Sequence, residues 1–452
     1  MSELKLFNTL TRKKEIFKPI EKDKIGIYVC GPTVNDVPHL GHARAQITFD
    51  VLRKYLLFLG YKVKFVSNIT DIDDKIINKA NELNEDIKEL TKRNTRAHLE
   101  DYKALNVAPP DVQPKATEYV KQMISLVQLL EKKDYTYIIP DDGVYFNIKK
   151  FKPYGKLSNK DIQNLKARAR IALKDQKKNK EDFVLWKFSK RGEPFWESPW
   201  GKGRPGWHIE CSAMSYSILG LPFDIHGGGQ DLIFPHHEDE IAQSEAAYGK
   251  KICNYWIHNG MVNVDKVKMS KSLGNFRTIQ DLLNQYPGEA IRYFVLSANY
   301  RKPIDFSFQN LDAAKNAYGR LKRKIFEIKK ETHKGNDLTK EYAEKFTEAM
   351  NDDLNTPKAL YIFWSLINDF DFAPKQKLKL IEKFDQVLSL GVKNMEEQKI
   401  PLPNEVKALL KERESLRKQK KWAEADIIRQ RIKDLGFLIE DKPEGPLITK
   451  SD

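Results

Sequence analysis

The sequence predicts a mixed α/β fold built on a parallel sheet, and three segments near its start predict it. The stretches KIGIYVCGPT and YKVKFVSNIT alternate in hydrophobicity and are rich in β-branched and aromatic residues, which is typical of strands. Between them, apolar residues recur at helical spacing over residues 42–59, and Gly60 offers a C-cap. These elements form a βαβ unit, so ligands are expected at the carboxyl ends of its strands.

The rest of the chain predicts further domains, because 452 residues are too many for one core. Residues 86–133 predict helices that are interrupted near NVAPPDVQP. Residues 135–203 are mixed and basic, as an inserted module would be, and the α/β pattern resumes at FDIHGGGQDLIFPHHEDEIAQSEAAYG. There the glycine run after a short strand indicates a backbone that approaches a ligand. Residues 310–391 predict a helical bundle, and residues 401–452 predict a charged helix pair with a short extended tail.

The composition excludes several classes of protein. No apolar run approaches the roughly 20 residues of a membrane span, and the first residues lack the apolar core of a signal peptide. Three cysteines do not make a disulfide framework and suit a reducing compartment. We therefore expect a cytoplasmic protein that is not associated with a membrane.

The net charge of +15 favours a polyanionic partner, with nucleic acid as the first candidate. The surplus is uneven, because residues 151–190 contain 12 Lys and Arg against 4 Asp and Glu, a net charge of +8. From residue 401 onward the corresponding counts are 12 and 10, so recognition there would be local. The alternative is that the lysines form solvated faces without a partner.

Two motifs suit a bound nucleotide. His39-Leu40-Gly41-His42 lies at the expected start of the first helix, where free backbone N–H groups and the helix dipole favour phosphate. Gly41 leaves room for a flat base against the backbone. Lys268-Met269-Ser270-Lys271-Ser272 supplies two lysines that can close over a triphosphate and stabilise a leaving pyrophosphate. Alone, each motif is also compatible with a structural turn or a solvated loop, but together they resemble the double signature of class I aminoacyl-tRNA synthetases.

A third group of residues suits a metal ion. Cys30 ends the first strand, and Cys211 follows the segment GWHIE. His236 and Glu240 are four residues apart and therefore share one face of a helix. Two thiolates, one imidazole and one carboxylate are ligands that zinc accepts in proteins.

Other assignments of these residues stay open at this point. Cys30 and Cys211 could be small buried hydrophobic residues, which is a common fate of a free cysteine. Within HHEDE, His237 or Glu238 could replace the two ligands chosen above. Cys253 has no such neighbours, so we assign it to packing.

The segments YVCGPTVNDVPHLGHAR, GWHIECSAM, FDIHGGGQDLIFPHHEDEIAQSEA and KMSKSLGN together resemble the cysteinyl-tRNA synthetase family over essentially the whole chain. The resemblance implies a monomer that is built from five parts. These are a Rossmann-type catalytic domain (1–118 and 222–265), an inserted module carrying part of the zinc site (119–221), a stem-contact region with the KMSKS loop (266–309), a helical bundle (310–395) and an anticodon-binding domain (396–452).

The resemblance also implies ligands and residue roles. One zinc ion per subunit would be held by Cys30, Cys211, His236 and Glu240, and Mg²⁺ would accompany ATP. Around ATP, His39 and His42 would hold the triphosphate, and Gly41 would leave room for the adenine. Lys271, and more weakly Lys268, would stabilise the departing pyrophosphate. Gln230 and Asp231 would accept hydrogen bonds from the ribose hydroxyls. In the tRNA for cysteine, the basic segment 151–190 would meet the acceptor arm, and the anticodon would meet Arg417, Trp422, Asp426 and Asp441.

The implied reaction has two steps. The carboxylate of L-cysteine attacks the α-phosphorus of ATP, giving cysteinyl-adenylate and pyrophosphate, and a ribose hydroxyl at the 3′ end of the tRNA then takes the cysteinyl group. A simple pocket separates cysteine from serine by only about 1–3 kcal/mol, whereas zinc prefers a thiolate, so we expect the substrate sulfur to ligate the zinc. Trp207 and His226 are candidate walls of the amino-acid pocket, with core packing as the alternative for both.

Three other functions share some of these features. A nucleotidyltransferase that makes small-molecule adenylates would have the first motif but not the second in this form. A ligase that joins cysteine to an amino-sugar would share the zinc site but lack an anticodon domain. A non-catalytic RNA-binding protein would not need both motifs intact.

Overall fold

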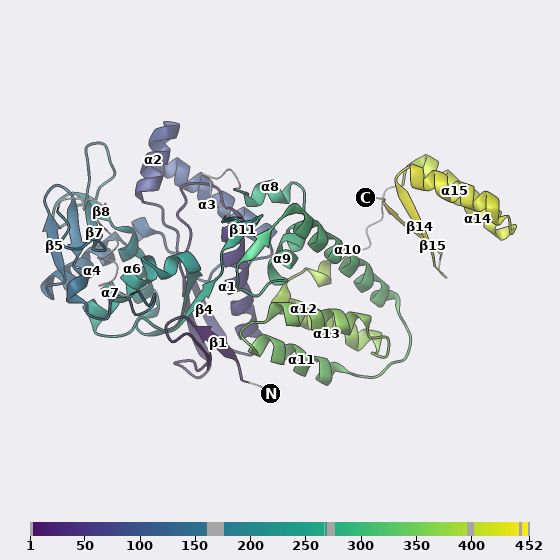
Figure 1. The fold of residues 1–452 in the computed structure, drawn as a ribbon, viewed down its shortest axis with the longest axis horizontal. Coiled ribbons are helices and arrows are strands. Elements are labelled where there is room, and N and C mark those ends of the chain that lie inside the picture. Colours follow the sequence, from purple (N-terminus) through teal and green to yellow (C-terminus); the bar gives the residue numbers. More distant parts are fainter. Residues whose placement is uncertain are drawn as a thin grey trace. The chain divides into compact units, whose positions relative to one another are not determined.

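The computed structural model describes residues 3–160, 176–265, 267–268, 276–395, 402–442 and 445–450. By its internal contacts the chain divides into two compact units, Met1–Asn394 and Met395–Asp452 (Figure 1). Among the described residues, no helix combines the length and the apolar character that a membrane span requires.

A four-stranded parallel sheet forms the centre of the first unit, as the sequence predicts. Its strand order is β10-β9-β3-β4, with β3 (Lys24–Val29) paired to β4 (Lys62–Ser67) on one side and to β9 (Phe223–Gly229) on the other. Strand β10 (Cys253–Asn259) pairs with the far edge of β9. The carboxyl ends of these strands therefore meet at one edge of the sheet, where Cys30 follows β3.

The helix between β3 and β4 is α1 (Leu40–Phe58), which starts two residues before the predicted helix. It starts there because the His39 side chain accepts the backbone N–H of Gly41 and caps the first turn. At the end of β3, Gly31 lies so close to the end of β4 that a Cβ atom would fall 1.6 Å from the carbonyl oxygen of Asn68. Only glycine fits this contact, which brings the two strand ends together.

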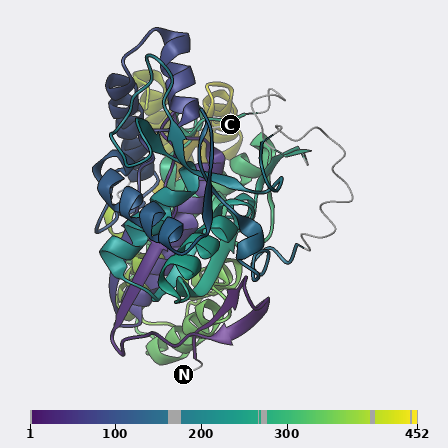
Figure 2. The same cartoon turned by 90° about the vertical axis from the view of Figure 1, so that its left-hand side faces the viewer.

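The insert, which faces the viewer in Figure 2, contains its own antiparallel sheet of order β5-β6-β7-β8. These strands are β5 (Thr136–Ile139), β6 (Gly143–Phe146), β7 (Phe183–Phe188) and β8 (Gly203–Pro205). The chain then returns through α6 (Trp207–Leu219), β9, the short helix η3 (Gln230–Ile233) and α7 (His236–Tyr248). One hydrophobic cluster contains Tyr28 and Val66 of the parallel sheet together with Leu185 and Trp186 of the insert. The insert therefore shares a core with the parallel sheet.

Other elements of the first unit surround this core. Before the insert's sheet the chain forms β1 (Lys5–Asn8), β2 (Lys13–Ile16), α2 (Asp74–Leu83), α3 (Ile87–Ala104), η1 (Ala116–Glu118) and α4 (Val120–Lys132), and η2 (Ile148–Lys150) follows β6. After β10 it forms β11 (Val262–Val264), β12 (Val267–Lys268), α8 (Ile279–Leu283), α9 (Gly288–Leu296) and β13 (Ile304–Phe306). The predicted helical region is formed by α10 (Phe308–Lys330), α11 (Thr339–Asn351), α12 (Thr356–Asn368), α13 (Pro374–Leu388) and η5 (Val392–Asn394).

The second unit contains the predicted charged helix pair, α14 (Asn404–Lys418) and α15 (Trp422–Asp434). The extended tail is a hairpin, because β14 (Phe437–Lys442) pairs antiparallel with β15 (Gly445–Lys450). Val406, Leu409, Ile428, Ile432, Phe437 and Ile439 form its small core. The finer boundaries inside the first unit stay predictions.

Candidate functional site

A cleft of about 470 Å³ opens at the carboxyl ends of the parallel strands. The loop between β3 and α1 forms one wall, and residues just after β9 and β10 form another. The described lining includes Cys30, His39, Gly41, His42, Trp207 and Asp231. The cleft therefore brings the first motif, one candidate zinc ligand and one candidate ribose contact to the same place.

The two histidines of the first motif are fixed by the backbone. The Gly41 N–H donates to His39 Nδ1 at 3.0 Å, and the His39 N–H donates to His42 Nδ1 at 3.2 Å. The ring centroids lie 3.8 Å apart. Because each Nδ1 accepts a hydrogen bond, each neutral ring carries its proton on Nε2, from which it can donate to a phosphate oxygen.

The expectation of free N–H groups at the start of α1 is wrong for its first residues. The Gly41 N–H is used by His39, and the Leu40 N–H donates to the carbonyl oxygen of Arg277 at 3.1 Å. The Ile279 N–H donates to the carbonyl oxygen of Pro38 at 3.0 Å. Two backbone segments therefore pair here, with a bridge between His39 and Thr278, and the N–H groups of Leu40 and Gly41 are not available to a ligand.

The second motif is described only in part. Lys268 ends β12, whose backbone pairs with β11. Residues 269–275, which include Lys271, lie outside the described residues. The chain is described again from Phe276, whose ring centroid lies 5.0 Å from that of His39. The segment that follows the second motif therefore contacts the first motif.

The four predicted metal ligands lie together beneath the cleft. Cys30 follows β3, Cys211 lies on α6, and His236 and Glu240 lie one turn apart on α7. One donor atom from each lies within 4.8 Å of all the others. Cys30 Sγ is 3.5 Å from Cys211 Sγ and 3.4 Å from Glu240 Oε1, and His236 Nε2 is 3.2 Å from the same oxygen. The chemistry of this donor set fits zinc.

A second set of donors overlaps the first. Cys30 and Glu240 also lie within 4.8 Å of donor atoms of His226 and His237. The Cys30 Sγ to His237 Nε2 distance is 3.3 Å. Glu238 belongs to neither set, because its carboxylate accepts the backbone N–H groups of Leu157 and Ser158. Of the two alternatives in HHEDE, only His237 is therefore close enough to compete.

Burial sets the protonation of these groups in the absence of a cation. It raises the pKa of the Cys30 thiol well above its ordinary value and also raises that of Cys211. It lowers the pKa values of His236 and His237 well below their ordinary value. All four groups are thus held neutral by desolvation. A divalent cation would reverse this preference for the thiols, since it stabilises a coordinating thiolate.

The two candidate walls of the amino-acid pocket differ in position. Trp207 lines the cleft, and its ring centroid lies 4.3 Å from that of His236. His226 is fully buried one layer deeper, with Nε2 2.9 Å from Glu240 Oε2 and its ring stacked on Trp256. Trp207 can therefore face a substrate, whereas His226 acts on Glu240.

The glycine run, predicted to follow a short strand, forms the last three residues of β9 and has two purposes. A Cβ atom at Gly227 would lie 2.2 Å from the Phe49 ring, and one at Gly228 would lie 2.9 Å from the His237 ring. The interpretation that the run approaches a ligand is wrong for these two glycines, which make room for protein side chains. Gly229 does border the cleft. Asp231 also lines the cleft, whereas Gln230 is not part of its described lining, and both residues are exposed at the start of η3.

Sequence analysis missed Asn68, which follows β4. Its Oδ1 atom accepts the Gly31 N–H at 2.9 Å and lies 3.6 Å from Cys211 Sγ. The rule that ligands lie at the carboxyl ends of parallel strands, which singled out Cys30 after β3, applies equally to the residue after β4. The sequence therefore contained a signal for Asn68.

The four predicted anticodon residues all lie on the second unit. Asp441 Oδ2 accepts hydrogen bonds from Arg413 and Arg417, each at 2.6 Å, and these cations lower the pKa of its carboxyl. The Arg417 guanidinium lies 5.6 Å from the ring centroid of Trp422, whose side chain is exposed. Asp426 is exposed one turn further along α15.

Comparison with known proteins bears on the whole chain. Residues 16–316 match the family model described as tRNA synthetases class I (C) catalytic domain, residues 345–391 match the DALR domain, and residues 401–445 match the cysteinyl-tRNA ligase anticodon binding domain. The cysteine–tRNA ligase of Haemophilus influenzae (strain 86-028NP) is 46% identical over 463 residues, with 98% of each chain covered. That of Thermococcus gammatolerans is 47% identical over 467 residues, again with 98% of each covered.

Solved structures are similar at the level of the fold. A methionyl-tRNA synthetase of Mycobacterium tuberculosis in complex with methionyl-adenylate superposes with a TM-score of 0.57 at 15% identity, covering 81% of this chain and 90% of that one. The LeuRS ternary complex from Agrobacterium radiobacter K84 gives a TM-score of 0.61 at 10% identity, covering 84% and 86%. At these low sequence identities, the similarities show that the fold is shared.

Proposed function

Because the chain belongs to the cysteine–tRNA ligase family of class I aminoacyl-tRNA synthetases, we propose that it activates L-cysteine with ATP in this cleft and transfers it to the tRNA for cysteine. Cys30, Cys211, His236 and Glu240 would hold a zinc ion, and this site would select the amino acid. The observation that carries the proposal is the convergence of these four donors, from three separate stretches of sequence, to within 4.8 Å beneath the cleft.

The bound zinc supplies a soft coordination position that prefers the thiolate of cysteine to the hydroxyl of serine. Pocket shape alone would give only about 10–200-fold discrimination between such similar molecules. Trp207 closes the pocket beside His236, and the buried His226 orients Glu240 from below. These side chains hold the ligands in one arrangement, which makes the site selective before the substrate arrives.

Activation of the amino acid needs no protein nucleophile, since the cysteine carboxylate is already ionised at neutral pH. The protein contributes by positioning the reactants and by stabilising the negative charge on the phosphates. His39 and His42 donate from Nε2 to the triphosphate, Gly41 admits the adenine, and Asp231 with Gln230 accepts from the ribose. Lys271, assisted by Lys268, stabilises the departing pyrophosphate, and Mg²⁺ accompanies ATP.

Recognition of the tRNA involves both units. The basic segment 151–190 meets the acceptor arm, although residues 161–175 of it lie outside the described residues. In the second unit, Trp422 offers an exposed ring for base stacking, and Arg417, Asp426 and Asp441 offer hydrogen bonds to base edges. Monomeric state and cytoplasmic location stay predictions.

The competing functions fit the observations less well. The match of residues 401–445 to an anticodon-binding domain supports tRNA as the acceptor, in preference to an amino-sugar. The match of residues 16–316 to a class I synthetase catalytic domain supports catalysis, in preference to RNA binding alone.

The experiment that tests the proposal is aminoacylation of a total tRNA pool with labelled cysteine or labelled serine. We expect cysteine to be attached to a single tRNA family in an ATP-dependent reaction and serine to be rejected. Transfer of cysteine to small amino-sugars without tRNA charging would contradict the proposal.

A further inference from the structure

The two nitrogens of His236 face in different directions. Nε2 lies among the zinc donors, 3.2 Å from Glu240 Oε1, and Nδ1 lies 2.9 Å from Nδ1 of His208. A nitrogen that binds a metal cannot carry a proton, so the proton of a metal-bound His236 has to be on Nδ1. The acceptor beside Nδ1 among the described residues is His208 Nδ1, and a neutral His208 then carries its own proton on Nε2.

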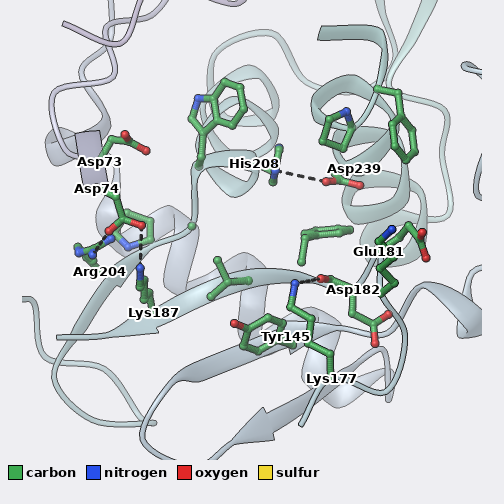
Figure 3. A pocket seen from close by; sticks show the side chains of 18 of the residues that line it. Asp73, Asp74, Tyr145, Lys177, Glu181, Asp182, Lys187, Arg204, His208 and Asp239 are labelled. Carbon is green, nitrogen blue, oxygen red and sulfur yellow. Dashed lines mark hydrogen bonds and ion pairs between the residues drawn. The ribbon is translucent and has the colours of Figure 1, made fainter. Parts of the chain in front are cut away.

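The protonated nitrogen of His208 faces a buried carboxylate. His208 Nε2 lies 3.4 Å from Oδ2 of Asp239, and Figure 3 shows the two side chains facing one another across the top of the cavity. Asp239 is only 1% exposed, and its Oδ1 accepts the hydroxyl of Tyr154 at 2.5 Å. Within the described part of the chain Oδ2 makes no hydrogen bond. A buried carboxylate oxygen needs a donor, and His208 Nε2–H is the donor beside it.

The competing histidine lacks such support. His237 Nδ1 lies 2.8 Å from His258 Nε2, and His258 Nδ1 lies 2.8 Å from the hydroxyl of Thr9. A hydroxyl both donates and accepts, so this chain of hydrogen bonds is equally good with the protons reversed. It therefore does not determine which nitrogen of His237 is free. The chain that runs from His236 ends beside Asp239 Oδ2, an oxygen without another partner among the described residues, and this end favours donation from His208 towards Asp239.

We propose that His208 and Asp239 are positioning residues that hold His236 with its Nε2 lone pair turned to the metal, and that this is why His236 rather than His237 completes the zinc site. The inference rests on the zinc site of the proposed function. A carboxylate that accepts from a ligating imidazole, directly or through a second ring, fixes its orientation and raises its basicity. Asp239 is in turn oriented by Tyr154, so the insert supports the metal across their shared core.

The cavity of about 520 Å³ at the outer end of this relay gives the proposal a further consequence. It is lined by Asp239 and His208 together with residues of the insert, among them Phe183 and Arg204 (Figure 3). The carboxylate end of the relay therefore faces the insert, whereas the metal end faces the catalytic cleft. Substitutions on the insert side change the metal site without touching the substrate.

The test measures zinc release from the full-length protein to a chromogenic chelator, with the zinc content of each variant determined first. Removal of an outer partner of a metal ligand typically weakens metal affinity about 10–100-fold. We expect losses of this size in Asp239→Leu and His208→Leu. His208→Asn retains an acceptor near the position of Nδ1 and should recover part of the loss. Thr9→Val, at the end of the other histidine chain, is the matched control and should release zinc at the wild-type rate.

A second measurement separates positioning from folding. In protein loaded with Co²⁺ in place of zinc, the visible absorption bands report the ligand sphere, and we expect them to shift in Asp239→Asn, which keeps the shape of the side chain. Wild-type zinc release and an unshifted spectrum in Asp239→Asn and His208→Leu would overturn the relay. So would equal zinc loss in Thr9→Val. A wild-type protein without stoichiometric zinc would instead overturn the proposed function.

Discussion

The backbone N–H of Leu40 donates a hydrogen bond of 3.1 Å to the carbonyl oxygen of Arg277, so the first nucleotide motif is bonded to the chain that leaves the second. This contact, with that of Ile279 to Pro38, holds the described residues that follow the second motif against the start of α1, at the edge of the cleft.

Lys271→Ala should slow adenylate formation by about 10²–10³-fold, since this is the usual cost of removing one preorganised charge donor. The effect belongs to the chemical step, so it should appear in single-turnover activation followed by rapid quench. Lys268→Ala is the matched variant and should have the smaller effect. An unchanged single-turnover rate in Lys271→Ala would contradict the assigned role.

Gly31→Ala should destabilise the fold, because its Cβ would lie 1.6 Å from the Asn68 carbonyl oxygen and one of the two strand ends would have to move. Overpacking of this kind costs about 1–3 kcal/mol in the free energy of unfolding. Gly319→Ala in α10 is the control, since a Cβ there meets nothing within 4 Å and alanine favours a helix by about 0.5–1 kcal/mol. Urea unfolding should move in opposite directions for the two variants.

Trp422→Ala should weaken tRNA charging while leaving cysteine-dependent pyrophosphate exchange unchanged. The ring is 56% exposed beside Arg417, and a stacked base is worth about 1–3 kcal/mol. The loss should appear in kcat/KM for tRNA. Phe370→Ala, which removes a still more exposed aromatic ring from the first unit, serves as the control. Equal losses in both variants would indicate that Trp422 has no specific part in tRNA recognition.

Stability should fall in acid in part because of His98. Its Nε2 lies 3.1 Å from the carbonyl oxygen of Asp36 in the cleft wall, and burial lowers its pKa to about 4. Since an unfolded histidine titrates near pH 6.5, the unfolded state takes up a proton below that pH which the folded state takes up only near pH 4. The stabilisation is therefore complete above pH 6.5 and is lost as the pH falls from about 6.5 towards 4.

The check compares wild type with His98→Gln, which retains a donor for Asp36 and does not titrate. From pH 7 to pH 5 the wild type should lose about 2 kcal/mol more free energy of unfolding than the variant. The difference isolates His98 from the other buried histidines. Parallel pH profiles would mean that His98 is not the group responsible.

Much of the fold was predictable because its signals are local. The alternation of the first two strands, the helical spacing between them and the rule for ligands at strand ends placed Cys30 and the first motif at one edge of the sheet. The same spacing argument put His236 and Glu240 on one helix face. The predicted helix started two residues late, because its N-cap is a histidine. The Nδ1 atom of His39 accepts the backbone N–H that a serine or aspartate oxygen usually accepts at this position.

What the sequence did not reveal depends on contacts between distant segments. Glu238 is ruled out as a ligand by Leu157 and Ser158, about eighty residues earlier in the chain. The proposed preference for His236 over His237 rests on His208 and Asp239, which no spacing rule connects to the predicted metal ligands. Gly227 and Gly228 serve neighbouring side chains that only the folded structure brings near.

The central claim is that a metal ion beneath the cleft recognises the sulfur of the substrate. Its most direct test is pyrophosphate exchange with cysteine and with serine, run on one preparation before metal removal, after it, and after zinc is restored, with zinc measured each time. The account predicts about one zinc per chain, loss of cysteine activation on removal and recovery on addition, with serine inactive throughout. Full activity and full discrimination in metal-free protein would contradict it.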